Sequence, residues 1–181
     1  MMLQPKQWSI EWGGRTLTIE TGRLALQALA SCTVKYGDTV IMATVMKSSE
    51  PRDGIDYFPL MVDFEEKLYA AGKIKGSRFI KREGRPSDDS ILTARLIDRA
   101  IRPLFNEATR TDVQVVITAL SVDGEHDASI VGMIGASAVL SLSSVPWNGP
   151  IAGARIGMDE NGKFILNVTS TQMAANSMLD L

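Results

Sequence analysis

The sequence predicts a single domain of mixed α/β architecture, in which helices pack against a sheet. Its 181 residues suit one domain, and its 45% apolar and 22% charged residues are typical of a soluble globular protein. Alternating apolar residues predict several short strands, and two longer apolar stretches predict helices. The second helix, over residues 127–144, is rich in small residues that permit close approach to a sheet or to another helix.

Strands are predicted where apolar residues alternate and turn residues interrupt the pattern. Residues 8–20 are expected to form a hairpin, and residues 30–36 and 39–47 form a second pair of strands. Residues 40–46, VIMATVM, are apolar on both alternate faces, which predicts a central strand covered on both sides. Further strands are expected over residues 57–64, 113–122, 151–158 and 163–169.

The most informative stretch runs from Gly76 to Phe105 and joins a basic loop to a helix. Ser87 before Asp88 and Asp89 predicts the helix start, because serine caps a first turn and acids there complement the helix dipole. Apolar residues cover most of the remaining helix surface, which predicts that the helix is buried. Three arginines spaced i, i+4 and i+7 share one face of it: Arg95, Arg99 and Arg102. A buried guanidinium needs a counter-anion, either an acid or a bound polyanion.

The basic loop concentrates positive charge in a chain whose formal net charge is −2. One aromatic ring among several cations is a composition that holds single-stranded nucleic acid, with phosphates on the cations and a base on the ring. These residues are Arg78, Phe79, Lys81, Arg82 and Arg85. A solvated charged loop is the alternative interpretation. Asp98 alone cannot neutralise the three helical arginines, so nucleic-acid binding and structural salt bridging both stay open.

Other kinds of site have little support in the sequence. His126 and Cys32 are the one histidine and the one cysteine, and they fall in different predicted elements, which disfavours nucleophilic catalysis. Cys32 is interpreted as a buried, inert thiol. The run Glu125-His126-Asp127 lacks a second His or Cys for a metal site and is interpreted as a turn followed by a helix N-cap. No signal peptide or membrane span is evident, so a cytosolic chain is expected.

Three long blocks of the sequence resemble the bacterial polynucleotide phosphorylase family, in its first core domain. They are TGRLALQALASCTVKYGDTVIMATV, PLMVDFEEKLYAAGKIKGSRFIKREGRPSDDSILTARLIDRAIRPLF and DASIVGMIGASAVLSLS. The resemblance implies an RNase PH-like domain of the ribosomal protein S5 domain 2-like type, an α/β (α+β) fold whose mixed sheet contains a left-handed βαβ crossover. It also implies a homotrimeric ring that degrades single-stranded RNA from the 3′ end, reversibly, with inorganic phosphate as co-substrate and nucleoside diphosphates as products.

The resemblance also implies roles for individual residues. The family's loop that grips RNA at the channel constriction matches Phe79, Lys81, Arg82 and Arg85. The family's helical arginines near the RNA path and the phosphate-bearing site match Arg95, Arg99 and Arg102. Ile80 stands where many members carry a second aromatic, and Lys81 where many carry arginine. One stacking surface and one bidentate donor are therefore expected to be lost.

The family's catalytic centre is expected in a second RNase PH-like domain, with adjacent serines at a helix start and an aspartate–lysine set that holds phosphate and a divalent metal, Mg²⁺. This chain has Asp127-Ala128-Ser129 at the corresponding helix start, without the serine pair, and Asp180 is a candidate match to one aspartate. The resemblance therefore implies no catalytic residue and no metal ligand in this segment.

The expected organisation is one RNase PH-like domain over residues 1–181, which ends as though truncated at SMLDL. Its implied partners are single-stranded RNA, further copies of the chain in a homotrimer, and components of an RNA-degradation complex, in the cytoplasm and away from membranes. An RNA-binding or ring-forming subunit of an exosome-type assembly, without catalysis of its own, is the alternative.

Overall fold

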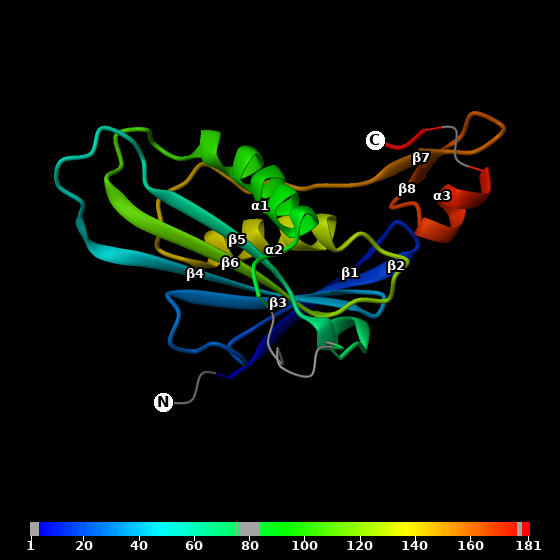
Figure 1. The fold of residues 1–181 in the computed structure, drawn as a ribbon, viewed down its shortest axis with the longest axis horizontal. Coiled ribbons are helices and arrows are strands. Elements are labelled where there is room, and N and C mark those ends of the chain that lie inside the picture. The colour runs from blue at the N-terminus through cyan, green and yellow to red at the C-terminus, as the bar shows by residue number, and fades with distance from the viewer. Residues whose placement is uncertain (1–3, 75, 77–83, 177–178) are drawn as a thin grey trace.

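The computed structural model places a mixed sheet beneath α1 and α2, with a small arm at the C-terminal end of the chain (Figure 1). It describes residues 4–74, 76, 84–176 and 179–181. The six-stranded sheet has the order β1-β2-β3-β4-β6-β5. Its strands are β1 (Lys6–Trp12), β2 (Arg15–Thr21), β3 (Ala30–Tyr36), β4 (Thr39–Pro51), β5 (Leu60–Glu66) and β6 (Thr111–Ser121). The helices over it are α1 (Asp88–Ile101) and α2 (Ala128–Leu142).

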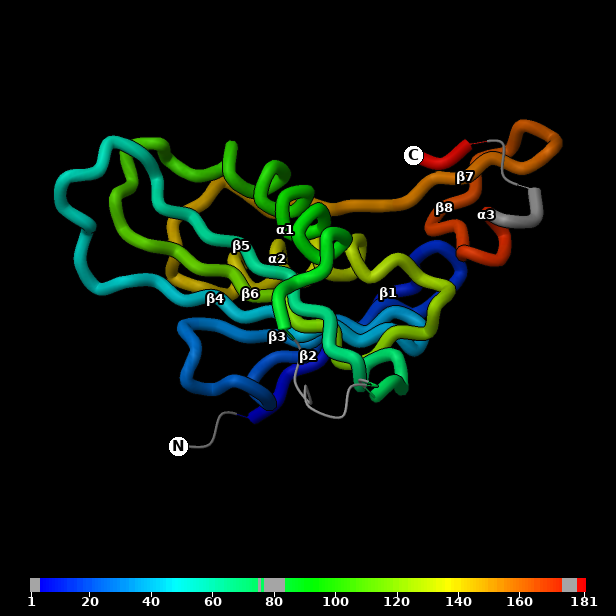
Figure 2. Tube along the Cα trace, in the orientation of Figure 1, coloured from blue at the N-terminus to red at the C-terminus, as the bar shows by residue number. Residues whose placement is uncertain are grey.

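Among the described residues, the other regular elements are two short 3-10 helices and the arm. The 3-10 helix η1 (Leu68–Ala71) follows β5, and η2 (Arg102–Leu104) follows α1. The arm consists of β7 (Ile156–Met158), β8 (Phe164–Leu166) and α3 (Ser170–Asn176). The tube in Figure 2 shows an extended stretch that leads from the end of α2 to this arm. Among the described residues, no helix is long and apolar enough to cross a membrane.

The predicted α/β class with a mixed sheet is confirmed. β1 to β4 and β6 pair with antiparallel neighbours, whereas β5 pairs with β6 in parallel. A parallel pair needs a crossover connection, and α1 supplies it between β5 and β6. The chain therefore forms a β5-α1-β6 unit at one edge of an otherwise antiparallel sheet.

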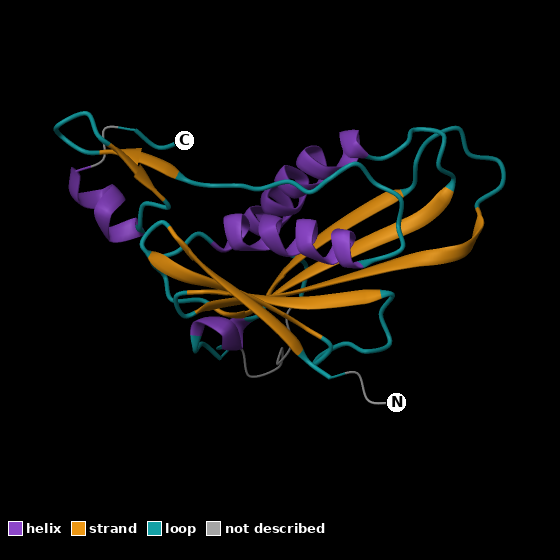
Figure 3. Cartoon of the chain, turned by 180° about the vertical axis from the view of Figure 1, so that it is seen from behind, coloured by secondary structure: helices purple, strands orange, loops and turns teal. Residues whose placement is uncertain are grey.

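The core lies between the helices and one face of the sheet. Seen from behind in Figure 3, α1 and α2 lie on the same side of the sheet and η1 lies on the other. The helix-facing side chains of the central strands are fully buried: Val34, Ile41, Ala43, Val45, Val113, Val115 and Ile117. The alternate residues of β4 are only half-buried, and Met46 is exposed. The prediction that residues 40–46 are covered on both faces was therefore wrong, because α1 and α2 pack on one face (Figure 3) and the described residues cover the other only in part.

Two glycines let α2 approach the sheet, as its small residues predict. A Cβ atom at Gly132 would lie 3.0 Å from the ring of Phe64 and 3.3 Å from Ile117. A Cβ atom at Gly135 would lie 3.3 Å from the Cβ atom of Ala43. The surrounding side chains belong to the packed core, so they have little room to move away.

Gly132→Val is therefore expected to destabilise the domain by about 1–3 kcal/mol, the usual effect of overpacking a core. Urea unfolding followed by circular dichroism measures this change. Ser141→Val on the exposed side of the same helix is the matched control and is expected to change stability by less than about 0.5 kcal/mol. Equal stabilities for the two variants would contradict this description of the α2–sheet contact.

The start of α1 was predicted correctly, but its burial was not. Ser87 is the N-cap, and its hydroxyl oxygen accepts a hydrogen bond from the backbone N–H of Ser90. Only one side of the helix, with Ile97 and Ile101, is buried against β5 and α2. Ile91, Leu92 and Leu96 are 46%, 59% and 48% exposed. In the described part of the chain, nothing covers the outer face of α1, so the apolar residues there do not indicate burial.

The predicted and observed boundaries of the elements differ most near the arm. The predicted strands at residues 151–158 and 163–169 shorten to three residues each, and the pairing of β7 with β8 is the hairpin that the Asn161-Gly162 turn predicts. The ambiguous stretch after β5 contains η1, and α3 was not predicted. Short elements carry few periodic residues, so sequence patterns place their ends poorly.

Candidate RNA-binding site

A cavity lies at the ends of β5 and β6, and the described residues that flank the basic loop, Gly76 and Gly84, line it. Of the loop's predicted RNA-binding residues, Phe79, Lys81 and Arg82 lie outside the described residues. Arg85 is described; it is exposed and lines the cavity together with Gly76 and Gly84. The structure therefore places one of the four predicted loop residues, at the entrance to α1.

The three helical arginines do not behave alike. Arg102 donates to both carboxylate oxygens of Asp98, at 2.8 and 2.6 Å, and to the backbone carbonyls of Phe58 and Leu60. This arginine ties the end of α1 to the segment that leads into β5. Arg95 and Arg99 are exposed and make no hydrogen bond or ion pair to any described residue. Their guanidinium groups are free to bind an anion from solvent, with up to five donors each.

The start of α2 is neutralised within the chain. Asp127 is the N-cap, and its carboxylate accepts from the backbone N–H and the hydroxyl of Ser129, at 2.8 and 2.6 Å. Arg155 lies 3.6 Å from Asp127 and donates twice to Asp180, at 2.8 and 2.7 Å. These hydrogen bonds lower the pKa of Asp180 and raise the pKa of Arg155. Both carboxylates thus have a cationic partner.

His126 belongs to a structural turn, as the interpretation of Glu125-His126-Asp127 predicts. Its ring is buried and its Nδ1 lies 2.5 Å from Oδ2 of Asp123. Burial alone would raise the pKa of Asp123, but hydrogen bonds from the backbone N–H and ring of His126, and from the N–H of Glu125, hold it well below its usual range. Asp123 was not predicted to take part in this turn. The spacing Asp-x-x-His around Gly124 is the sequence signal that would have identified it.

No described cluster resembles another catalytic or metal site. Among the residues that the structure describes, no three His, Cys, Asp or Glu side chains gather as metal ligands would. Cys32 is buried, and burial raises the pKa of its thiol to about 12, which agrees with the predicted inert thiol. The exposed arginines and the cavity near Arg85 are therefore the candidate binding features of the described chain.

Comparison with known proteins decides the family. Residues 13–146, about three-quarters of the chain, match RNase PH, the 3′ exoribonuclease family, domain 1. The chain belongs to this RNase PH family. The matched residues include α1, α2, η1 and the cavity, while the arm lies outside them.

Relatives of the RNase PH chain are similar over nearly its whole length. It is 57% identical over 171 residues to the polyribonucleotide nucleotidyltransferase of Heliobacterium modesticaldum, covering 94% of this chain and 24% of the relative. It is 52% identical to the enzyme of the same name from Staphylococcus aureus, over 100% of this chain and 25% of the relative. The chain thus spans about a quarter of the length of these curated relatives.

A solved structure shows the same fold at low sequence identity. The crystal structure of rice (Oryza sativa) Rrp46 aligns with a TM-score of 0.67 over 97% of this chain and 73% of that chain, at 13% identity. Such a likeness supports the RNase PH-like fold and nothing beyond it. The fold expected from the sequence blocks is thereby confirmed.

Proposed function

We propose that this chain is the first RNase PH domain of a phosphorolytic 3′→5′ exoribonuclease and that it guides RNA rather than cutting it. The names of its relatives support the reaction, in which inorganic phosphate attacks the terminal phosphodiester and releases a nucleoside diphosphate. The observation that carries the guiding role is the exposed, unpaired state of Arg95 and Arg99 within the described chain. Two arginines one turn apart can hold adjacent phosphates of a strand.

The proposed RNA path runs from the basic loop to α1. In the basic loop, Phe79 stacks a base while the cations there bind phosphates: Lys81, Arg82 and Arg85. Arg95 and Arg99 bind the next phosphates of the strand along α1. Arg102 contributes chiefly by holding α1 against β5, because Asp98 and two carbonyls already occupy its donors. The chain as a whole is slightly acidic, so these local cations, rather than net charge, would attract RNA.

The proposed catalytic centre lies outside this segment. Two carboxylates lie near the start of α2. Asp127 caps the helix and pairs with Arg155, and Asp180 accepts hydrogen bonds from Arg155. These residues do not fit a divalent metal, so a Mg²⁺ ion used in phosphorolysis is proposed to bind elsewhere in the complete protein. The homotrimeric ring, the cytoplasmic location and association with other RNA-degrading proteins belong to the same proposal.

The products of RNA decay test the reaction. With single-stranded RNA, the complete protein is expected to release nucleoside diphosphates only when inorganic phosphate is present, and to extend RNA from nucleoside diphosphates in the reverse direction. Thin-layer chromatography of labelled products separates diphosphates from monophosphates. Release of nucleoside monophosphates without phosphate would show hydrolysis and would overturn the proposed reaction.

A further inference from the structure

A cavity of about 640 Å³ lies at the carboxyl ends of the parallel strands β5 and β6. The starts of α1 and α2 and the 3-10 helix η1 form its other walls. Its volume falls in the range of small-molecule sites, and the carboxyl ends of parallel strands are where α/β folds commonly bind ligands. Neither the family match nor the names of the relatives assigns it a ligand.

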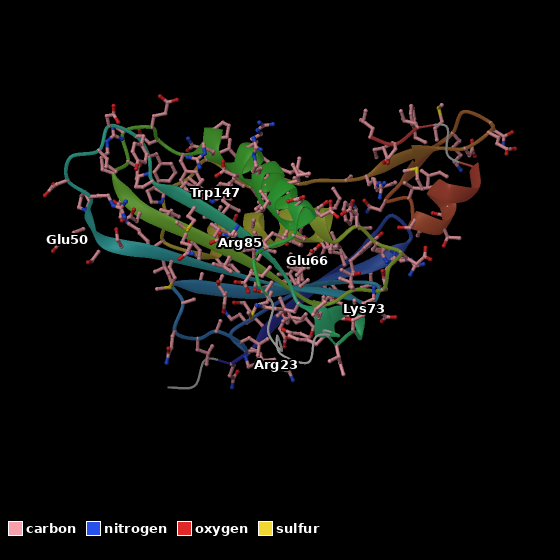
Figure 4. All side chains as sticks on the ribbon, viewed as in Figure 1. Arg23, Glu50, Glu66, Lys73, Arg85 and Trp147 are labelled. Atoms are coloured by element: carbon pink, nitrogen blue, oxygen red, sulfur yellow. The ribbon has the colours of Figure 1, made fainter. Side chains whose placement is uncertain are left out.

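The floor of the cavity is apolar, whereas its rim carries charges of both signs. Phe64, Ala70 and Ala119 form buried parts of the floor. Arg85 and Lys73 line the cavity and make no side-chain hydrogen bond or ion pair to the described residues. Figure 4 labels both cations and Glu66, and in this view Glu66 lies between Arg85 and Lys73. A flat apolar ligand with an anionic attachment matches this arrangement.

Glu66 is the polar group best placed to read such a ligand. Its Oε2 accepts the hydroxyl of Ser87 at 2.7 Å, which holds the carboxylate at the start of α1. The described residues supply no other hydrogen bond to it, so Oε1 is available. The neighbouring Glu65 is neutralised by Lys67 at 2.8 Å. A carboxylate only accepts hydrogen bonds, so it selects a ligand with N–H donors.

We propose that this cavity takes one base of single-stranded RNA, with guanine favoured and the flanking phosphates on Arg85 and Lys73. The inference rests on the proposed RNA-guiding function and adds a base-reading site to it. Guanine presents two adjacent N–H donors on its Watson–Crick edge, which suit a carboxylate. Uracil presents one N–H between two carbonyl oxygens, which a carboxylate repels. A free phosphate ion suits the site less well, because the carboxylate of Glu66 lines the cavity and would repel it.

Binding of two RNA strands by the complete protein tests the proposal. The probes are fluorescein-labelled ten-nucleotide oligouridylate and the same strand with one central guanosine, compared by fluorescence anisotropy with EDTA and without phosphate. The unsubstituted protein is expected to bind the guanosine strand about tenfold more tightly, the discrimination that one good carboxylate–base contact supplies.

Two variants separate the base site from the rest of the RNA path. Glu66→Gln keeps the side-chain shape but adds a donor that suits uracil, so the guanosine preference is expected to fall to about parity. Ala71→Trp places an indole in the cavity from an exposed position of η1 and is expected to weaken only the guanosine strand, to the level of oligouridylate. Ala152→Trp, on an exposed residue outside the cavity, is the matched control and leaves both affinities unchanged.

The outcomes distinguish this inference from the proposed function. The base site would be overturned if both variants kept the guanosine preference, or if the unsubstituted protein showed none. In either case, tight binding of oligouridylate would still support RNA guiding. A protein that binds neither strand at low salt would overturn both. Circular dichroism tests whether the Ala71→Trp variant folds. If this variant is unfolded, the guanosine preference of Glu66→Gln alone tests the base site.

Discussion

Replacing Arg95 and Arg99 together with alanine is expected to lower the rate of phosphate-dependent RNA decay by the complete protein about 30-fold. Each exposed arginine–phosphate contact contributes roughly 1 kcal/mol, and the loss of two contacts corresponds to that factor. The initial rate of nucleoside diphosphate release at RNA concentrations below KM measures the change. The effect should be largest at low salt, because salt screens exposed contacts.

The salt dependence of RNA binding separates a contact with the strand from an indirect effect. For single strands, the slope of log K against log salt changes by about 0.7 for each phosphate contact, so the double variant should lose about 1.4 from the slope. Arg23→Ala is the matched control, because Arg23 is an exposed arginine in the segment between β2 and β3 and pairs with Glu20. Unchanged decay and an unchanged slope in the double variant would refute the proposed RNA path along α1.

Asp123→Asn is expected to destabilise the domain by about 2–3 kcal/mol at pH 7. The carboxylate accepts hydrogen bonds from the backbone N–H groups of Glu125 and His126 and contacts the His126 ring, so it holds the turn before α2. Hydrogen bonds to a charged group contribute roughly 1.5–3 kcal/mol, and an amide nitrogen cannot replace the oxygen that faces His126 and the N–H of Asp38. Urea unfolding measures the loss, and Asp38→Asn at an exposed carboxylate is the control.

The same substitution has a defined pH dependence. The pKa of Asp123 is lower in the folded state than the ordinary aspartate value of about 3.9. Its contribution to stability is therefore fully present above about pH 4 and is lost as the pH falls from there towards the folded pKa. The stability difference between Asp123→Asn and the unsubstituted protein should persist from pH 5 to 8 and shrink below pH 4. A difference that grows on acidification would contradict the assignment.

The elements that local chemistry specifies were predicted closely. Ser87 followed by Asp88 and Asp89 marks the start of α1, and Asp127 marks the start of α2, because a helix start needs a side-chain acceptor for its free N–H groups. The hairpins of the sheet follow from apolar alternation and glycine turns, which act over a few residues. The resemblance of three long sequence blocks to a known family also predicted the fold, and the comparisons confirm that fold.

The burial of α1 could not be predicted from its composition. Leu92 and Leu96 are apolar, yet they face outwards because a single layer of helices covers this edge of the sheet. The sequence pattern shows how apolar a helix face is but not whether another element lies against it. Arg95, Arg99 and Arg102 are exposed for the same reason, so the argument from burial that each needs a counter-anion does not apply to them.

The sequence by itself determined the helix starts, the hairpins, the family and the concentration of cations between residues 73 and 102. Only the tertiary structure decided which arginines pair with a carboxylate and which stay exposed. It joined Arg102 to Asp98 and the β5 segment, Arg155 to Asp127 and Asp180, and left Arg95 and Arg99 without described partners. Ion pairs between distant segments depend on how the elements pack, and local sequence patterns do not encode that packing.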